Sequence, residues 1–470
     1  MSATPGGPEL GVPADPMRWW GIREIVRLAV PTVLTTVSMT LMQFVDGLMV
    51  ARVGVDSMSA QLPGGMASFT PQCFFIGLLS CVSTFAAQYL GAKRPELGAV
   101  YAWQGLWLSA AAAAAMAVLV PTAGPLMSLF RHSPEVFVLE VPYFQILIGG
   151  SIFALASAAL GGFFVGLHRP VIPLIAGVVG NVVNFVVALV LIFGLTGFPR
   201  LGLVGAGIGS VAGMAVQAGV MAWFFLAGRR SAEGEVRRSW RPAWGPMKDL
   251  IRLGAPAGAM FVGDVLMWTI FMGGIVGGFG VATLAATNIL WRYWPLCFMP
   301  AIGVGNAVTA IVGRYCGAGQ PRLAWRRAHA GLMLVEAYMI TMGVVLWLYR
   351  DPLVGIFNDS RDPTVQAIAT QTFIFILLCQ AFDALNVIFI GALRGAGDTL
   401  WPSLIQIALA YGLGVGGAAL VAARFPEWGV LGPWVVASLY IALLGLVMWL
   451  RFLGGKWRTM SVVPENAVND

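Results

Sequence analysis

The stretch IREIVRLAVP at residues 22–31 returns as MKDLIRLGAP at residues 247–256, and QYLGAKRPEL from Gln88 returns as RYCGAGQPRL from Arg314. Two later pairs keep this register, namely GLHRPVIP ending at Pro173 with LRGAGDTLWP ending at Pro402, and GLVG from Gly202 with GVLG from Gly429. The four separations are 225, 226, 229 and 227 residues, which unrelated apolar segments would not hold so constant. The chain therefore carries an internal duplication, which in a hydrophobic protein is typical of transporters.

The composition is that of a membrane protein. Hydrophobic residues make up 58% of the 470 residues, charged residues only 10%, and the mean hydropathy is +0.82, whereas soluble globular proteins carry roughly 25% charged residues. Residues 1–22 contain several prolines and no apolar core, which predicts a disordered tail and not a cleavable signal peptide. The five cysteines lack metal-ligand spacing and are interpreted as small buried hydrophobes.

Twelve apolar runs are long enough to cross a bilayer. They lie at residues 24–51, 62–89, 98–123, 137–160, 170–194, 203–227, 250–277, 285–313, 327–349, 365–393, 402–424 and 430–453. Six fall in each repeat, so both repeats enter the membrane from the same side and are related by a pseudo-two-fold axis along its normal. The expected fold is all-α and integral to the membrane, with an N-lobe at 23–228 and a C-lobe at 247–453, each of six helices.

The distribution of Lys and Arg predicts the orientation, because these residues accumulate in cytoplasmic loops. With both termini placed inside, 21 of them lie in the tails and inner loops and six in the outer loops. We therefore expect a multi-pass protein of the inner (plasma) membrane with cytoplasmic termini. The basic connector at 229–246 and the tail at 454–470 would then face anionic lipid, which is favoured over a nucleic-acid role.

Two carboxylates are predicted near the middle of the membrane, where each costs on the order of 2.5 to 3.5 kcal/mol. At the helical rise per residue, Asp264 lies about 18 Å beyond Arg252, and Asp383 lies about 16 Å before Arg394. Two acids at one depth in one lobe can share a proton or coordinate a cation such as Na⁺. The alternative is that each acid separately hydrogen-bonds a neighbouring helix.

Five further polar residues of the spans are candidates for the transport path or its support. Asp46 lies near the outer end of the first span, either as a functional acid or as an interfacial one, and Gln43 would share its helix face. Arg292, in WRYWP, is either an outer-interface residue within an aromatic belt or a cavity-facing counter-ion. Asn288 is a candidate for the substrate cavity or its polar support. Glu336, within the ninth span, fits a structural pairing as well as a functional role.

Pro31 and Pro256 occupy equivalent positions early in the first and seventh spans. Each proline removes a backbone hydrogen bond and permits a kink. The pair is therefore a candidate for hinges in equivalent helices, although prolines are also common in membrane helices for structural reasons.

The order of four motifs is typical of a known family. FVDGLMVARVG contains Asp46, QYLGAKRPE follows the second span, PAGAMFVGD ends at Asp264, and FDALNVIFIGALRGAGDT contains Asp383. Over residues 22–453 the chain resembles the multidrug and toxic compound extrusion (MATE) transporters. The resemblance implies twelve helices in two lobes that form a V around a central cavity, and export driven by inward movement of H⁺ or Na⁺.

The resemblance also implies roles for individual residues. Asp46 falls on the family's acid of the first span, which is implicated in cation coupling, whereas Asp264 and Asp383 fall on acids of the seventh and tenth spans. In the fifth span the family has an Asn and, four residues later, an Asp or Asn. Here Asn184 matches the first position, but the second is Ala188, so the expected coupling site shifts to Asp264 and Asp383.

The resulting hypothesis is a cation-coupled (H⁺ or Na⁺) antiporter that exports amphipathic, often cationic organic compounds by alternating access. An enzyme is disfavoured, because there are only three histidines and neither a metal pattern nor GxSxG. The absence of GxxxxGK[ST] disfavours ATP-driven transport by this chain alone. We expect no cofactor, no metal other than Na⁺ at Asp264 and Asp383 if Na⁺ is the coupling ion, and a monomer in contact with lipid and a small-molecule substrate. The alternative is a lipid or lipid-linked oligosaccharide flippase, or a narrow-substrate exporter, of the same superfamily.

Overall fold

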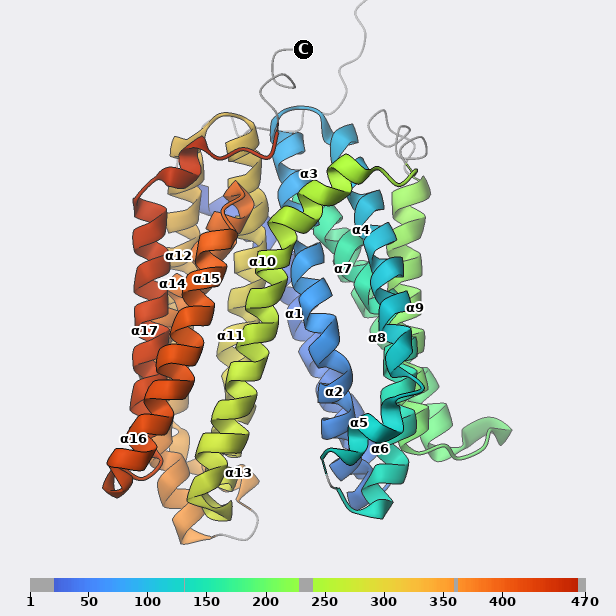
Figure 1. The fold of residues 1–470 in the computed structure, drawn as a ribbon, viewed down its shortest axis with the longest axis vertical. Coiled ribbons are helices and arrows are strands. Elements are labelled where there is room, and N and C mark those ends of the chain that lie inside the picture. Colours follow the sequence, from blue (N-terminus) through green and yellow to red (C-terminus); the bar gives the residue numbers. More distant parts are fainter. Residues whose placement is uncertain (1–20, 131, 228–239, 359–361, 464–470) are drawn as a thin grey trace, which may run out of the picture.

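The computed structural model describes residues 21–130, 132–227, 240–358 and 362–463, and these are almost wholly helical (Figure 1). Eleven helices are long and apolar enough to cross a membrane, and a bent pair of helices brings the number to twelve. The prediction of an all-α membrane protein with twelve spans is therefore confirmed. Most of the predicted tail at 1–22 and connector at 229–246 lies outside the described residues.

The first half of the chain contains six spans. Their helices are α1 (Ile22–Ala51), α2 (Val55–Ser80) continued by α3 (Val82–Gly91), α4 (Pro95–Met116), α6 (Pro134–Gly149) continued by α7 (Ser151–Gly166), α8 (Val171–Phe193) and α9 (Leu203–Ala227), with the short η2 (Ala117–Leu119), α5 (Ala123–Ser128) and η3 (Leu195–Gly197) between them.

The second half repeats this order. Its helices are α10 (Trp244–Thr269) continued by η5 (Ile270–Ile275) and η6 (Val276–Phe279), α11 (Val281–Gly317), α12 (Pro321–Leu348), the short α13 (Arg350–Phe357), α14 (Pro363–Ala396), α15 (Leu400–Leu409) continued by η7 (Ala410–Gly417) and α16 (Ala418–Arg424), η8 (Pro426–Trp428), α17 (Leu431–Leu453) and η9 (Lys456–Thr459). Pro95 opens α4 and Pro321 opens the equivalent α12, because proline suits the first helical turn. At α14, Asp362 adds a side-chain cap by accepting from the Thr364 N–H at 2.8 Å.

The helices form an N-terminal bundle (α1–α9) and a C-terminal bundle (α10–α17) that stand side by side (Figure 1). The bundles meet where α1 and α3 pack against α11 and where α2 packs against α10. Small residues permit this close approach. A methyl group on Gly77 of α2 would lie 2.7 Å from the Cα of Gly258 on α10, and one on Gly303 of α11 would lie 2.6 Å from the Cα of Val33 on α1.

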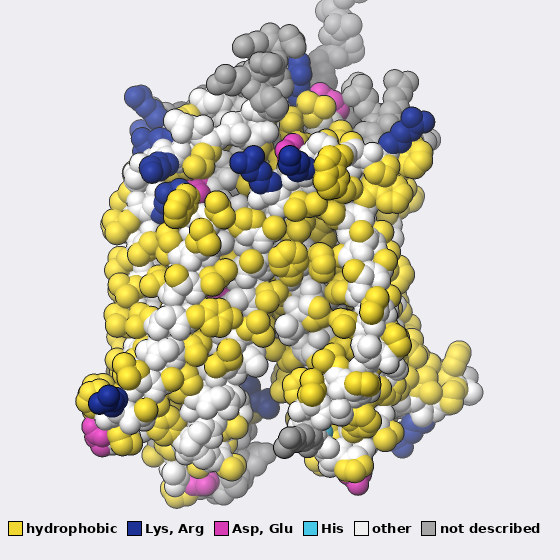
Figure 2. Space-filling model, in the orientation of Figure 1, with side chains coloured by type: hydrophobic (Ala, Val, Ile, Leu, Met, Phe, Trp, Pro, Cys, Tyr) yellow, Lys and Arg dark blue, Asp and Glu magenta, His cyan; other side chains and the backbone are white. Residues whose placement is uncertain are grey.

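The two ends of the molecule differ. We call the end at which α1 begins and α17 ends the terminal face, and the opposite end the far face. Most of the Lys and Arg side chains visible in Figure 2 lie near the terminal face, whereas the bundles are separated by a notch at the far face. The terminal face is therefore the closed end of the molecule and its more basic one.

The helices deviate from regular geometry at places other than the two candidate hinges. Pro31 and Pro256 lie inside the continuous helices α1 and α10. The chain instead bends by 42° between α6 and α7, and the π-helical segments η5 and η7 interrupt the seventh and eleventh spans. A hinge role for the prolines stays a prediction.

Candidate functional site

Asp264 of α10 and Asp383 of α14 lie in one polar site inside the C-terminal bundle. Asp383 is buried and Asp264 is half-buried, and the two carboxylates are near enough to interact electrostatically. Gln406 Nε2, from α15, donates a hydrogen bond to Asp264 Oδ1 at 3.2 Å. Asn386, one turn after Asp383 on α14, is its hydrogen-bonding neighbour. The two acids that the sequence places at one depth thus lie within electrostatic reach of each other, while Asp264 also hydrogen-bonds the neighbouring helix α15.

Several buried oxygen atoms around these acids lack a hydrogen-bond partner among the described residues. Gln406 Oε1 lies beside Asp264, Asn386 Oδ1 beside Asp383, and the Tyr440 hydroxyl of α17 within electrostatic reach of both acids. Leaving such an atom unsatisfied costs on the order of 1–3 kcal/mol. Amide and carboxylate oxygens are ligands that hard cations accept, and they also receive hydrogen bonds from a protonated group. The site therefore fits either Na⁺ or a proton.

The N-terminal bundle holds a second, separate acid. Asn184 Nδ2 of α8 donates to Asp46 Oδ2 of α1 at 3.0 Å, while Asp46 Oδ1 and Asn184 Oδ1 are buried and have no partner in the part of the chain that the structure describes. Tyr143 of α6 is close enough to interact electrostatically with Asp46. Asp46 is therefore engaged within the bundle, which does not fit an acid that only reaches the headgroups.

The position of Ala188 explains why this site lacks the additional polar residue of the family pattern. Ala188 is fully buried, and a methyl group on Gly209 of α9 would lie 2.7 Å from the Ala188 Cβ. Helices α8 and α9 thus pack too closely here for a longer side chain. Substituting Asp or Asn at this position would require the two helices to separate.

The other predicted polar residues are not brought to either acid site. The Arg292 guanidinium lies 5.0 Å from the ring centroid of Phe357 on α13, at the far face, which favours the outer-interface interpretation. Gln43 on α1 and Asn288 on α11 are exposed, and Glu336 is half-buried within α12. Among the described side chains, these three make no hydrogen bond or ion pair.

Sequence reasoning missed Gln406, Asn386 and Tyr143. Each is a polar or amphipathic residue in an apolar span, but its role in an acid site depends on which helix its side chain faces. Gln406 was the most accessible to inference, because an amide within an apolar span needs a buried partner.

A cavity of about 570 Å³ that is widely open to the surface lies at the seam between the bundles, beside the helix that carries Asp264. It is lined by α2 (Thr70, Pro71 and Phe74), α10 (Ala259, Val262, Gly263 and Leu266), α15 (Ile407) and η7 (Tyr411). This volume and apolar lining are in the range that holds a small organic molecule. Across the described residues, no group of three His, Cys, Asp or Glu side chains is placed to hold a metal ion.

Comparison with known proteins identifies the family. The MatE family model matches residues 31–190 and 260–420, one segment in each half of the chain. A Xanthomonas axonopodis pv. citri protein named "Probable multidrug resistance protein NorM" is 30% identical over 468 residues, covering 98% of each chain. A Thermotoga maritima protein of the same name is 25% identical, covering 95% of this chain and 96% of its own.

Solved structures share the fold. One, described as the outward-facing conformation of a multidrug resistance MATE family transporter of the MOP superfamily, superimposes with a TM-score of 0.84 at 19% identity, covering 93% of this chain and 97% of its own. A MOP superfamily transporter from Pyrococcus furiosus, whose binding pocket of reverse polarity suggests a different function for that protein, gives a TM-score of 0.83 at 19% identity, with the same coverage. With two MatE segments, NorM relatives along its whole length and the matching twelve-span fold, the chain belongs to the MATE family of multidrug efflux transporters, which are not enzymes.

Proposed function

We propose that this transporter is a cation-coupled antiporter that exports amphipathic, often cationic organic compounds by alternating access. The observation that carries this proposal is the shared site of Asp264 and Asp383, with orphaned oxygens of Gln406, Asn386 and Tyr440 around it. The coupling ion is proposed to be H⁺ or Na⁺.

The position of Asp264 suggests how cation binding alters the structure. Two ionised carboxylates repel each other strongly in a low-dielectric interior, and one bound cation removes most of this repulsion. Asp264 lies on α10, which packs against α2 of the other bundle. A change in how α10 packs onto α15 is therefore transmitted to the seam and to the cavity beside it.

The energy available from the coupling ion is sufficient for export. One monovalent cation that moves down a potential of 100 mV supplies about 2.3 kcal/mol. This supports about a fiftyfold concentration ratio of a neutral compound exchanged for one cation. The Asp46–Asn184 pair is proposed as an additional cation site in the N-terminal bundle.

We place the protein in the inner (plasma) membrane with the terminal face cytoplasmic. The higher density of Lys and Arg near that face supports this orientation. The notch at the far face would then open to the outside. The protein is proposed to act as a monomer without a cofactor and without nucleic acid.

A flippase or narrow-substrate exporter remains the second candidate, because the seam cavity is lined almost entirely by apolar groups. An acyl chain fits such a lining as well as an aromatic drug does. A headgroup, however, needs polar partners, and Arg292 lies over Phe357 and not in this cavity.

The direct test is efflux of a fluorescent cationic dye from proteoliposomes, with Na⁺ and pH gradients imposed separately. The proposal expects gradient-driven efflux by the wild type and its loss in Asp264→Asn and Asp383→Asn. Glu427→Gln, which removes an exposed acid of the far face, serves as the control and is expected to behave as wild type. Absence of dye transport by the wild type, together with transport of a labelled lipid, would favour the flippase.

A further inference from the structure

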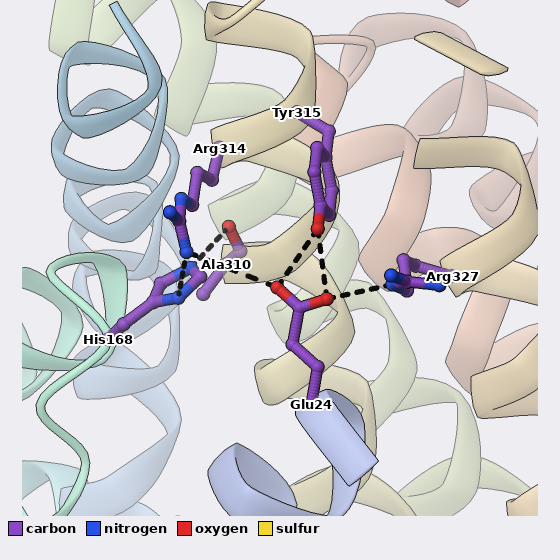
Figure 3. A network of polar contacts seen from close by, with 6 residues as sticks. All are labelled: Glu24, His168, Ala310, Arg314, Tyr315 and Arg327. Carbon is purple, nitrogen blue, oxygen red and sulfur yellow. Dashed lines mark hydrogen bonds and ion pairs between the residues drawn. The ribbon is translucent and has the colours of Figure 1, made fainter. Parts of the chain in front are cut away.

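One carboxylate of the N-terminal bundle is bound by several side chains of the C-terminal bundle near the terminal face (Figure 3). Glu24, in the first turn of α1, accepts a hydrogen bond through Oε2 from Arg327 Nε of α12 at 2.8 Å. The Tyr315 hydroxyl of α11 contacts both oxygens, at 2.9 and 3.2 Å, and Arg314 Nη1 lies 4.0 Å from Oε1. Glu24 is thus the centre of a polar network between the bundles.

The network is buried, so water cannot readily replace its members. The Arg327 side chain is 1% exposed and that of Glu24 is 10% exposed. The Arg327 guanidinium also lies 5.7 Å from the centre of the Tyr315 ring. Removing one partner of such a pair leaves an uncompensated buried charge, which is strongly unfavourable. The network is therefore either complete or fully opened to solvent.

His168 adds a second connection from the N-terminal bundle. It lies in the turn between α7 and α8 with a φ of 59°, and its ring enters the network of Figure 3. Nδ1 is 3.5 Å from Arg314 Nη1, and Nε2 is 3.3 Å from the Ala310 carbonyl oxygen. Because arginine only donates, Nδ1 must accept and Nε2 must carry the proton. The geometry thus requires a neutral His168.

The hydrogen bonds and ion pairs of this network cross from one bundle to the other. Glu24 and His168 belong to the N-terminal bundle, while Arg314, Tyr315 and Arg327 belong to the C-terminal bundle. Within the described ranges, each ion pair that joins the bundles includes Glu24, whereas the pairs His132–Glu140 and Arg451–Asp398 lie within one bundle. Separating the bundles at the terminal face must break this network, while opening them at the far face need not.

We propose that Glu24, His168, Arg314, Tyr315 and Arg327 form a latch that holds the terminal face closed and must open and reform in each transport cycle. This inference rests on the proposed alternating access and assigns to these residues a role apart from cation coupling. None of them lies on α10 or α14, which carry Asp264 and Asp383. The latch therefore sets the relative stability of the two conformations and not the affinity for the cation.

The latch can be tested by the reactivity of a native cysteine. Cys81, between α2 and α3, is fully buried, and its thiol donates to the Leu253 carbonyl of α10 across the seam. In a variant whose other four cysteines are replaced by alanine, the rate of maleimide labelling of Cys81 reports opening of this seam. The assay uses the full-length protein in proteoliposomes and needs neither cargo nor an ion gradient.

We expect Glu24→Gln to raise the Cys81 labelling rate about tenfold, because the amide keeps the shape of the side chain but loses the charge that two arginines bind. Glu96→Gln, in the first turn of α4 at the same face, is the matched control and should leave the rate unchanged. An unchanged rate in Glu24→Gln, or an equal increase in both variants, would overturn the latch.

Arg314→Gln provides a second variant if Glu24→Gln fails to fold, and the same increase in labelling is expected from it. The outcome is distinguishable from failure of the proposed antiport. Raised Cys81 labelling in a protein whose wild type shows no ion-driven efflux would retain the latch and refute cation coupling. Normal ion-driven efflux with unchanged labelling would retain cation coupling and refute the latch.

Discussion

Gln406 of α15 donates a 3.2 Å hydrogen bond from Nε2 to Asp264 Oδ1 on α10, and its own Oε1 is buried with no partner among the described residues. The Gln406 amide therefore positions the Asp264 carboxylate, which is a site candidate from the sequence, and places its own carbonyl oxygen beside that carboxylate. This arrangement explains why an amide is tolerated in an apolar span. It also leads to a test that separates the two candidate cations.

Gln406→Leu removes both the donor to Asp264 and the free carbonyl oxygen. If Na⁺ is the coupling ion, the concentration of Na⁺ needed for half-maximal efflux should rise about tenfold, since a hydrogen bond to a charged group contributes roughly 1.5–3 kcal/mol. The measurement is dye efflux as a function of external Na⁺ at fixed pH. Efflux that depends on pH and never on Na⁺, in the wild type as in the variant, would exclude Na⁺.

The N-terminal bundle gives a second prediction. Asn184→Ala removes the only hydrogen bond that Asp46 makes among the described side chains, at 3.0 Å. If the coupling site lies at Asp264 and Asp383, this variant should retain ion-driven efflux within a few-fold of wild type. The measurement compares the efflux rates of Asn184→Ala and Asp383→Asn at equal expression, and the loss should be greater in Asp383→Asn. A greater loss in Asn184→Ala would place the coupling site in the N-terminal bundle.

His168 should make closure of the terminal face dependent on pH. Burial and the adjacent Arg314 lower the pKa of His168 from 6.5 to about 4, against a smaller opposing effect of Glu24, which together are the charged groups that act on it from α11 and α1. A group with a lowered pKa in the closed form binds its proton preferentially in the open form. Closure is thus fully favoured above pH 6.5 and weakens as the pH falls towards 4.

At pH 5.5 this linkage raises the ratio of the open to the closed form about tenfold relative to neutral pH. The measurement is Cys81 labelling at pH 7.5 and pH 5.5, each normalised to His168→Gln so that the pH dependence of the maleimide reaction cancels. We expect acid to raise the normalised rate. A ratio that does not change with pH would refute the role of His168.

The close seam between α2 and α10 gives a prediction for stability. Gly77→Ala places a methyl group 2.7 Å from the Gly258 Cα, so the two helices must move apart. Overpacking of this kind typically costs 1–3 kcal/mol. Thermal unfolding in detergent should show a lower Tm for Gly77→Ala than for the wild type. Gly219→Ala should leave the Tm unchanged, because Gly219 of α9 has open space around it. An equal Tm for both variants would contradict the seam geometry.

Much of the fold could be predicted from the sequence, because hydrophobic length alone defines a membrane span and helical rise alone gives the depth of an acid. The similar depth of Asp264 and Asp383 follows from these two quantities, whereas their electrostatic proximity depends on how the helices pack. The contact of Gln406 could not be derived, since it depends on how α15 packs against α10.

The latch could not be predicted from the sequence, for a different reason. Glu24, Arg314 and Arg327 lie near span ends, where charged residues are expected, and in the sequence the two arginines count only as evidence for orientation. His168 lies in a turn whose direction no periodicity describes. Contacts between helix ends that are more than 280 residues apart depend on how the two bundles pack, which a single sequence does not specify.

Equilibrium competition between dye and cation in the purified protein tests the central claim most directly. An antiporter that couples through Asp264 and Asp383 should bind a cationic dye more weakly as Na⁺, or H⁺, is added, and Asp383→Asn should lose this competition while Glu427→Gln keeps it. Dye binding in Asp383→Asn that still weakens with added cation to the same extent as in wild type would contradict the account.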